Sequence, residues 1–430
     1  MSALGVQVTE HDSGWSPLAR IGFRFCFTYF ALFGLLFAQI LFVFAGIAVA
    51  WLPEDAIHWQ MDRVAPLAEW VGEHILGVDA VLRSNGSGDQ AAIWVMVLIL
   101  VVLTAAITLI WTVLARRTEY RTLGTWFVTA IRLAAGGQLL WYGWAKLVPN
   151  QMPYPSLATL LRPFGEFSAI DVLWNQVGVS PAYQVLLGAA EVVAGLLLFW
   201  PRTATLGGMI GLISMLQVFL LNMTYDVPVK ILSFHLVLMS LIVLAPQTRR
   251  MLDFLVLQRD TAPATQRPLF GTRRAERIAA AVQVALGLWV TTACLHDAHE
   301  IWYEYGYGAP KPALYGIWNV TEFSRDGQVL PPLTTDENRW QRLVVDRGVI
   351  TYQQMDGTLV AAPGEVDPQA RTITATPVRL VFEESAPDRL IVRGEIDGHP
   401  ITASLDRQDL DAFRLRGPGF HWVQNEPAFS

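Results

Sequence analysis

Long apolar runs alternate with short polar stretches through the first three hundred residues of this chain. A helix that crosses a bilayer needs about 20 mostly apolar residues. Seven stretches reach or approach that length, although Arg132 interrupts the third and Glu191 the fourth. The pattern predicts membrane spans at residues 24–51, 91–115, 125–147, 181–200, 203–222, 230–247 and 276–295.

The pattern changes after residue 296, where short runs of β-branched and aromatic residues are separated by turn residues. Asp-Gly pairs, which favour tight hairpins, occur at 326–327, 356–357 and 397–398. The runs read YGIWNVTEF, QRLVVD, GVITYQQ, RTITATP, RLVFEE, RLIVRGEI, HPITASL and AFRLR. The predicted fold class is therefore an all-α polytopic membrane bundle followed by a small antiparallel all-β domain, an up-and-down sheet or barrel.

Composition agrees with a membrane protein and narrows its partners. The chain is 53% hydrophobic and only 16% charged, where soluble domains are about 25% charged. The net charge of −6 and the lack of basic runs argue against nucleic acid as a partner. Cys26 and Cys294 are the two cysteines, which excludes a disulfide-rich scaffold.

Lysine and arginine are concentrated on one set of flanks, which we expect to be cytoplasmic. Seven spans then place the N-terminus inside and the C-terminal domain outside. The predicted boundaries are a cytoplasmic N-terminus at 1–22, two spans at 23–124 with an outer loop at 52–90, a four-helix core at 125–250, a cytoplasmic loop at 251–275, the seventh span at 276–295, a linker at 296–312 and a β-rich domain at 313–430.

Arg132, Lys146 and Glu191 are the charged residues of the third and fourth spans. A charge near the membrane centre costs about 2.5–3.5 kcal/mol, so each marks a candidate functional site. Arg132 and Lys146 are fourteen residues apart and share a helix face. Glu191 could pair with Arg132. That pair could be a buried salt bridge, or part of a proton or substrate site, or the two could lie apart.

The segment LNMTYDVPVKILSFHLVLMS, residues 221–240, contains a second group of polar residues. Pro228 lies between Asp226 and Lys230 and predicts a broken turn between two spans. Either this turn is an outer hairpin with an extended Lys230, or Tyr225, Asp226 and Lys230 face inward and bind a polar head group. His235 lies deeper, as a packing residue or a proton carrier.

Two further segments carry polar residues near the predicted outer surface. Residues 149–180 mix Pro and Gly with Leu, Phe and Trp, and we expect this segment to pack on the bundle as a lid that includes Arg162 and Glu166. The segment CLHDAHE places His296 and His299 three residues apart, as a metal site would require, but a polar helix end explains the same residues. We predict no metal.

The stretches AIRLAAGGQLLWYGWAKLVP and GAAEVVAGLLLFWPRTATLGGMI, with the helix through His235, resemble the DoxX-like membrane family. Arg132, Lys146, Glu191 and Arg202 match its pattern, over roughly 125–250. The resemblance implies a bacterial inner-membrane protein with a periplasmic β domain and links it to membrane redox chemistry. The segment beginning YGIW also loosely resembles the first strand of a lipocalin-like barrel.

These observations lead to two functional hypotheses. In the first, the protein is a redox-linked component that binds a quinone or small anion in a polar pocket at the outer face and works with a redox partner protein. The second is a non-enzymatic scaffold, or a lipid- or cargo-binding protein, whose β domain engages a partner. The pocket of the first hypothesis has Glu191, Lys230, Asp226 and His235 as catalytic residues, and Arg132, Lys146, Tyr225, Arg162 and Glu166 as substrate-binding residues.

Overall fold

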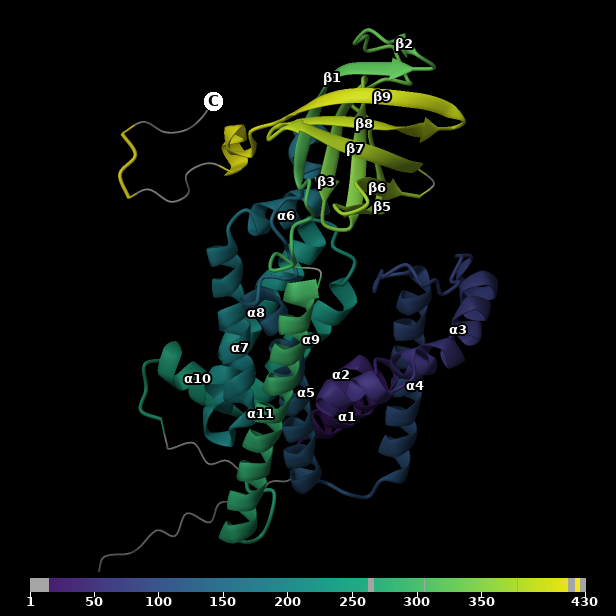
Figure 1. The fold of residues 1–430 in the computed structure, drawn as a ribbon. Coiled ribbons are helices and arrows are strands. Elements are labelled where there is room, and N and C mark those ends of the chain that lie inside the picture. Colours follow the sequence, from purple (N-terminus) through teal and green to yellow (C-terminus); the bar gives the residue numbers. More distant parts are fainter. Residues whose placement is uncertain (1–14, 262–266, 305, 377, 417–421, 426–430) are drawn as a thin grey trace, which may run out of the picture. The chain divides into compact units, whose positions relative to one another are not determined.

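The computed structural model describes residues 15–261, 267–304, 306–376, 378–416 and 422–425 (Figure 1). The chain forms two compact units, one of residues 1–147 and 186–297 and the other of residues 148–185 and 298–430. The helices are α1 (Pro17–Leu36), α2 (Gln39–Phe42), α3 (Trp59–Val71), α4 (Ala91–Leu114), α5 (Arg121–Leu147), α6 (Ala169–Gly178), α7 (Pro181–Phe199), α8 (Ala204–Thr224), α9 (Lys230–Leu244), α10 (Thr248–Leu255) and α11 (Arg273–Glu304).

Helices occupy all seven stretches that the hydrophobic pattern predicted as spans. Within the described residues, six of the helical segments are long and apolar enough to cross a membrane. The helix at the third stretch, α5, is not among them, and it carries the polar residues Arg132, Gln138 and Lys146 on buried positions. The apolar helices thus indicate a multi-pass membrane protein. The more polar helix α5 lies where the third of the seven spans was expected.

The first predicted span is wrong as a single helix, because the helical path breaks twice between residues 24 and 51. The helix α1 ends at Leu36, and Gly46 lies in a conformation with φ 59° that residues with a side chain rarely adopt. The indole of Trp289 fills the place that a Cβ at Gly46 would occupy, only 2.7 Å away. Gly46 therefore allows the chain to bend closely around Trp289.

Glycines bring the backbones of α5 and α7 into close contact. A Cβ at Gly188 would lie 2.3 Å from the Leu147 backbone nitrogen, and a Cβ at Gly143 would lie 2.8 Å from that of Val192. Seven residues after Gly188 on α7, Gly195 lies against the Gly136 carbonyl oxygen in the same way. Such small-residue contacts are the usual means by which helices pack in membranes, where no hydrophobic driving force acts between them.

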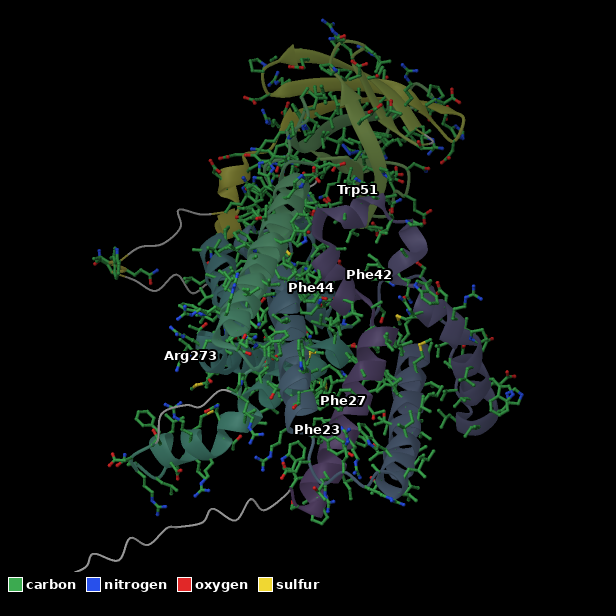
Figure 2. All side chains as sticks on the ribbon, turned by 90° about the horizontal axis from the view of Figure 1, so that it is seen from below. Phe23, Phe27, Phe42, Phe44, Trp51 and Arg273 are labelled. Atoms are coloured by element: carbon green, nitrogen blue, oxygen red, sulfur yellow. The ribbon has the colours of Figure 1, made fainter. Side chains whose placement is uncertain are left out.

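Aromatic side chains pack α1 against α5 at the other side of this unit. The ring of Phe27 lies 5.6 Å from that of Phe127, and the ring of Phe23 lies 6.0 Å from it. Figure 2 shows Phe23 and Phe27 on the same stretch of α1, with Phe42, Phe44 and Trp51 on the segment that continues it. This aromatic contact explains why the amino-terminal helix belongs to the same unit as α5.

The C-terminal domain is an antiparallel barrel, which is one of the two forms predicted from the sequence. Its strands are β1 (Gly316–Arg325), β2 (Gln328–Val329), β3 (Trp340–Asp346), β4 (Val349–Gln354), β5 (Leu359–Asp367), β6 (Thr372–Ala375), β7 (Val378–Ala386), β8 (Arg389–Ile396) and β9 (His399–Arg407). The strands pair with their sequence neighbours, and β1 also pairs with β9, which closes an eight-stranded barrel with β2 as an extra hairpin arm (Figure 1).

The Asp-Gly turns are confirmed at all three predicted places, with Asp356-Gly357 in the longer connection between the paired strands β4 and β5. Asp326-Gly327 and Asp397-Gly398 connect paired strands, and all four residues have positive φ, as a type I′ hairpin requires. Strand β5 was missed because its Ala361, Pro363 and Gly364 are poor strand formers. The prediction of a strand at AFRLR was wrong, since residues 410–416 form short 3-10 turns.

Large apolar side chains fill the inside of the barrel. Trp318, Phe323 and Phe382 are almost fully buried in one cluster with twelve other buried residues, which come from β3, β4, β6, β7, β8 and β9 and include Leu314 before β1. A bulge between Val320 and Glu322 shifts the alternation of β1, so that Trp318 and Phe323 both point inward. The barrel is therefore held by a packed interior.

Residues 148–185 belong to the barrel unit, which the sequence did not predict. Leu157 is fully buried against Ile317 of β1 and Val344 of β3. Its backbone nitrogen donates to the Asp346 carboxylate at 3.0 Å. Because Ile317 and Val344 alternate with the inward residues Trp318 and Leu343, they lie on the outer face of the barrel. The segment covers that face.

Candidate functional site

Lys146 and Glu191 form a buried ion pair between α5 and α7. Lys146 Nζ lies 2.8 Å from Glu191 Oε2, and the two side chains are 6% and 3% exposed. Lys146 Nζ also lies 5.8 Å from the centre of the Tyr142 ring. The expected pairing of Glu191 with Arg132 is wrong, because the close Gly143 and Gly188 contact holds Glu191 beside Lys146, one turn beyond Gly143.

Arg132 instead binds neutral groups. Its Nη1 donates to the carbonyl oxygen of Leu198 at 2.8 Å, and its Nη2 donates to Gln283 Oε1 of α11. Leu198 is in the last turn of α7, where carbonyl oxygens have no partner within the helix. The guanidinium thus caps α7 and neutralises the negative end of its dipole. Among the described residues, Arg132 forms no ion pair.

The turn between α8 and α9 is broken as predicted, but its charged residues do not form an inward pocket. Lys230 Nζ lies 2.8 Å from Asp226 Oδ1, and the Asp226 side chain is 89% exposed. Tyr225 directly follows α8 and its backbone nitrogen donates to the Leu221 carbonyl. Lys230 Nζ also lies 3.8 Å from Asp89 Oδ2, whose side chain is 8% exposed, so Lys230 joins an exposed and a buried carboxylate at the hairpin.

Asp89, a residue that the sequence did not point to, holds the start of α9. Its Oδ2 accepts from the Lys230 backbone nitrogen at 2.7 Å and its Oδ1 from that of Ile231 at 3.0 Å. Gly88 donates to the Pro228 carbonyl at 2.9 Å, and a Cβ there would lie 3.2 Å from that oxygen. A carboxylate at this position accepts from two N–H groups that have no partner within the helix. Its negative charge also offsets the positive end of the helix dipole.

His235 lies in an aromatic contact between α9 and α1. Its Nδ1 is 2.6 Å from the Ile231 carbonyl oxygen, which can only accept, so Nδ1 carries the proton. Its Nε2 then accepts from the Tyr29 hydroxyl at 2.6 Å. The imidazole stacks on the Phe33 ring with centres 3.8 Å apart. This arrangement satisfies both ring nitrogens and fits the packing alternative.

Arg162 and Glu166 belong to the barrel unit, whereas the charged residues of the helices belong to the other unit. Arg162 Nη2 donates to the Glu166 carbonyl oxygen and lies 3.3 Å from Asp171 Oδ2. Its guanidinium also lies over the Phe167 ring. The contacts of Arg162 are local and stabilise the loop before α6.

Seven of the nine predicted site residues lie in the helical unit, and Arg162 and Glu166 lie in the barrel unit. The nine residues fall into the Lys146–Glu191 pair, the Arg132 cap, the Lys230 hairpin, the His235 contact and the Arg162 loop. Within the described residues, no group of three His, Cys, Asp or Glu side chains could hold a metal ion, and His296 and His299 belong to no such group.

Comparisons with known proteins identify a related protein, but they assign no activity. No family model matches the chain, and no solved structure matches it. A stretch of 112 residues, 25% of this chain, is 35% identical to the "Uncharacterized protein YwoB" of Bacillus subtilis (strain 168) and covers 69% of it. The chain belongs to the YwoB family. Membership in the YwoB family fixes no substrate, and the DoxX-like resemblance stays a prediction.

Tyr29, Asp89 and Gln283 are the polar partners that sequence reasoning missed in this YwoB-family chain. Each binds a candidate residue from a distant part of the chain, with separations of 206, 141 and 151 residues. The signal that could have found Asp89 was the NGSGDQ segment, since its turn residues end in a carboxylate at the predicted outer surface. Tyr29 and Gln283 carried no such signal.

The barrel carries a polar depression that sequence reasoning also missed. It has a volume of about 380 Å³ and is lined by Thr321, Ser385, Arg389, Leu390, Ile391, Ser404, Leu405 and Asp406. Thr321 is the bulged residue of β1, without a register partner on β9, and its hydroxyl donates to the Ser404 carbonyl at 3.0 Å. Arg389 Nε lies 3.5 Å from Asp406 Oδ1. Both signs of charge thus border one open depression.

Proposed function

We propose that this YwoB-family protein is a non-enzymatic membrane scaffold or cargo-binding protein that acts through its barrel. The observation that carries the proposal is the internal pairing of the helix charges. Lys146 binds Glu191, Arg132 binds Leu198 and Gln283, and His235 uses both ring nitrogens. Groups that satisfy each other hold helices together and are less available for a substrate.

The polar depression of the barrel supports the second half of this proposal. Arg389 and Asp406 are 71% and 49% exposed by their side chains, so their charges can reach a partner. Ser385, Ser404 and Thr321 add hydroxyl groups around them. A polar surface with both signs of charge suits a protein partner better than an apolar cargo.

A photo-cross-linking experiment in cells tests this function. A photoreactive amino acid replaces Ser385 or Ser404 of the full chain, and a matched control places it at exposed Glu365 of β5. We expect the depression positions to form a discrete adduct with a partner protein that the control position does not form. Equal products from all three positions, or none from the depression, would count against the proposal.

A quinone-binding redox component is the second candidate, and the His235 contact favours it. A tyrosine hydroxyl that donates to an imidazole inside an aromatic cluster is a polar group placed in an apolar surrounding. An ionisable group at such depth is a functional hypothesis by default. In this candidate, Tyr29 and His235 would move a proton beside a bound quinone.

Solvent extraction of the purified full chain, followed by mass spectrometry, tests the quinone candidate. A stoichiometric quinone that is lost from the His235→Gln and Tyr29→Phe variants would support it. The control is Ser240→Ala, since Ser240 is a buried hydroxyl of the same helix that binds only the Leu236 carbonyl. A wild-type protein that carries no quinone would contradict it.

A further inference from the structure

Four cationic side chains and three tyrosines gather in the barrel unit, and none of them lines the depression. They come from the segment after α11, the β3–β4 turn, the end of β9, the C-terminal 3-10 turns and the segment before Leu157. We call this group the basic–aromatic cluster. Its members are Tyr154, Tyr307, Lys311, Tyr315, Arg347, Arg407 and Arg416.

Ring contacts connect the members in a continuous series. The Arg347 guanidinium lies 5.4 Å from the centre of the Tyr307 ring and 5.5 Å from that of Tyr315. Lys311 Nζ lies 4.9 Å from the centre of the Tyr315 ring, so Lys311 and Arg347 contact the same tyrosine. At the other end, the Tyr307 and Tyr154 rings are 5.9 Å apart. The side chains are therefore neighbours, not scattered surface residues.

Arg416 and Arg407 complete the series at its two ends. The Arg416 guanidinium lies 5.7 Å from the Tyr154 ring, and Arg407 Nη2 donates to the Tyr315 carbonyl at 2.8 Å. Burial and the negative charge of Asp346 raise the pKa of Tyr315, while the positive charges of Arg347 and Arg416 act against that rise. Both arginines thus place their charge close to the same phenol.

In the part of the chain that the structure describes, no carboxylate forms an ion pair with one of the four cations, Lys311, Arg347, Arg407 and Arg416. Arg347 donates to the carbonyl oxygens of Ala309 and Tyr307, which do not cancel its charge. The adjacent Asp346 accepts from the backbone nitrogens of Leu157 and Arg347. Asp346 supplies one negative charge near four positive ones, and an external anion would offset the remaining excess of positive charge.

Chain continuity places one part of the cluster close to a membrane-spanning helix. Tyr307 follows the last residue of α11 by three positions, so it lies within about 11 Å of the end of that helix. A 32-residue helix is about 48 Å long and exceeds the roughly 30 Å hydrocarbon core. Its end therefore reaches the level of the lipid headgroups or just beyond.

We propose that the basic–aromatic cluster binds a phosphate-bearing anion, either the headgroup phosphate of an anionic lipid or a free phosphate. Arginine and lysine N–H groups donate to phosphate oxygens, and tyrosine is suited to the headgroup level because one end is apolar and the other polar. Lys311 and Arg416 are the main ligands, since within the described residues no hydrogen bond occupies their side chains. The site is independent of the depression and of its proposed partner.

Native mass spectrometry of the full chain tests the lipid source. Protein in detergent is mixed with phosphatidylglycerol or phosphatidylcholine, and the variant is Lys311→Gln/Arg416→Gln. The control, Arg371→Gln/Arg379→Gln, removes the same charge from exposed barrel positions. We expect wild type and control to retain phosphatidylglycerol over phosphatidylcholine, and the variant to bind it at least about tenfold more weakly.

Inorganic phosphate tests the free source in the same proteins. A rise of the melting temperature with phosphate, but not with equal chloride, in wild type and control only would support a free phosphate site. A variant that retains lipid and phosphate like wild type, or a control that loses them equally, would overturn the proposal. If the double variant loses its circular dichroism spectrum, the single variant Lys311→Gln gives the same comparison.

Discussion

Lys146 Nζ and Glu191 Oε2 lie 2.8 Å apart at the contact of α5 and α7, where neither side chain is more than 6% exposed. Taking one charge into such a place is costly, and the partner offsets much of this cost. The glycines around the pair hold the two backbones at the distance that the ion pair needs. At the residue scale, the charges of the helical unit are therefore part of its packing.

Replacing Glu191 with glutamine should lower the free energy of unfolding by about 3 kcal/mol, because Lys146 loses its anion while it stays buried. The double variant Lys146→Met/Glu191→Leu should recover most of this loss, since no charge is left unpaired. Thermal unfolding of the detergent-purified proteins measures both. Equal melting temperatures for the single and the double variant would contradict a mainly structural pair.

Asp89→Ala should cost about 1–2 kcal/mol, because α9 loses the carboxylate that accepts from its first two N–H groups. The matched control is Asp226→Ala, which removes the exposed partner of the same Lys230. We expect the control to change the stability less, since an exposed ion pair contributes little. Chemical denaturation in detergent provides the comparison, and a larger effect of Asp226→Ala would refute this view of Asp89.

At the element scale, α6 shows how a short helix begins after an irregular loop. Ser168 Oγ accepts from the Asp171 backbone nitrogen and Asp171 Oδ2 accepts from that of Ser168, which is a reciprocal capping box. Burial would raise the pKa of Asp171, but the hydrogen bonds from Ser168 and Arg162 outweigh it and lower the pKa. The carboxylate form therefore stabilises the helix start.

The stability that Asp171 contributes should depend on pH in a defined direction. A carboxyl whose folded pKa is lowered contributes fully above its unfolded pKa of about 3.9 and loses the contribution as pH falls through the folded pKa. Hydrogen exchange of α6 should therefore be faster in Asp171→Asn than in wild type at pH 7. The two proteins should converge well below pH 4. A difference that persists there would contradict the prediction.

Elements were predictable where the pattern was local. The period of the apolar runs gave the helices, and Asp326-Gly327 and Asp397-Gly398 gave two hairpins. The breaks at Gly46 and the strand β5 were not predictable, because the first depends on Trp289 of a distant helix and the second on pairing with β4 and β6. Tertiary contacts overrode the local preference in both cases.

The candidate site was predicted as a set of residues but not as an arrangement. Lys146, Glu191 and His235 are indeed buried polar residues among apolar helices. Tyr29, Asp89 and Gln283, which bind His235, Lys230 and Arg132, come from distant segments, so spacing along one helix could not reveal them. The sequence also did not predict that Leu157, in the segment of Arg162, packs against β1 and β3.

At the scale of the whole molecule, apolar helices and a barrel unit share one chain, and the arginine bias predicts which side of the membrane holds each part. In a background without Cys26 and Cys294, Ser385→Cys should react with a membrane-impermeant maleimide in intact cells. Arg250→Cys, in α10, should react only after the membrane is opened. The shift in mass on a gel measures the labelling of both variants. The reverse labelling pattern would contradict the proposed orientation.

Because residues 148–185 pack on the barrel, this segment is synthesised well before the strands that it contacts. Leu157 is synthesised 160 residues before Ile317, the strand residue that covers it. At about 5–20 residues per second, the wait is roughly 8 to 32 s. Throughout this interval Leu157, Leu160 and Leu161 have no barrel to bind, so the nascent chain offers an apolar segment to chaperones or proteases. Production of this protein should therefore be most vulnerable during its own translation, before the last third of the chain has emerged.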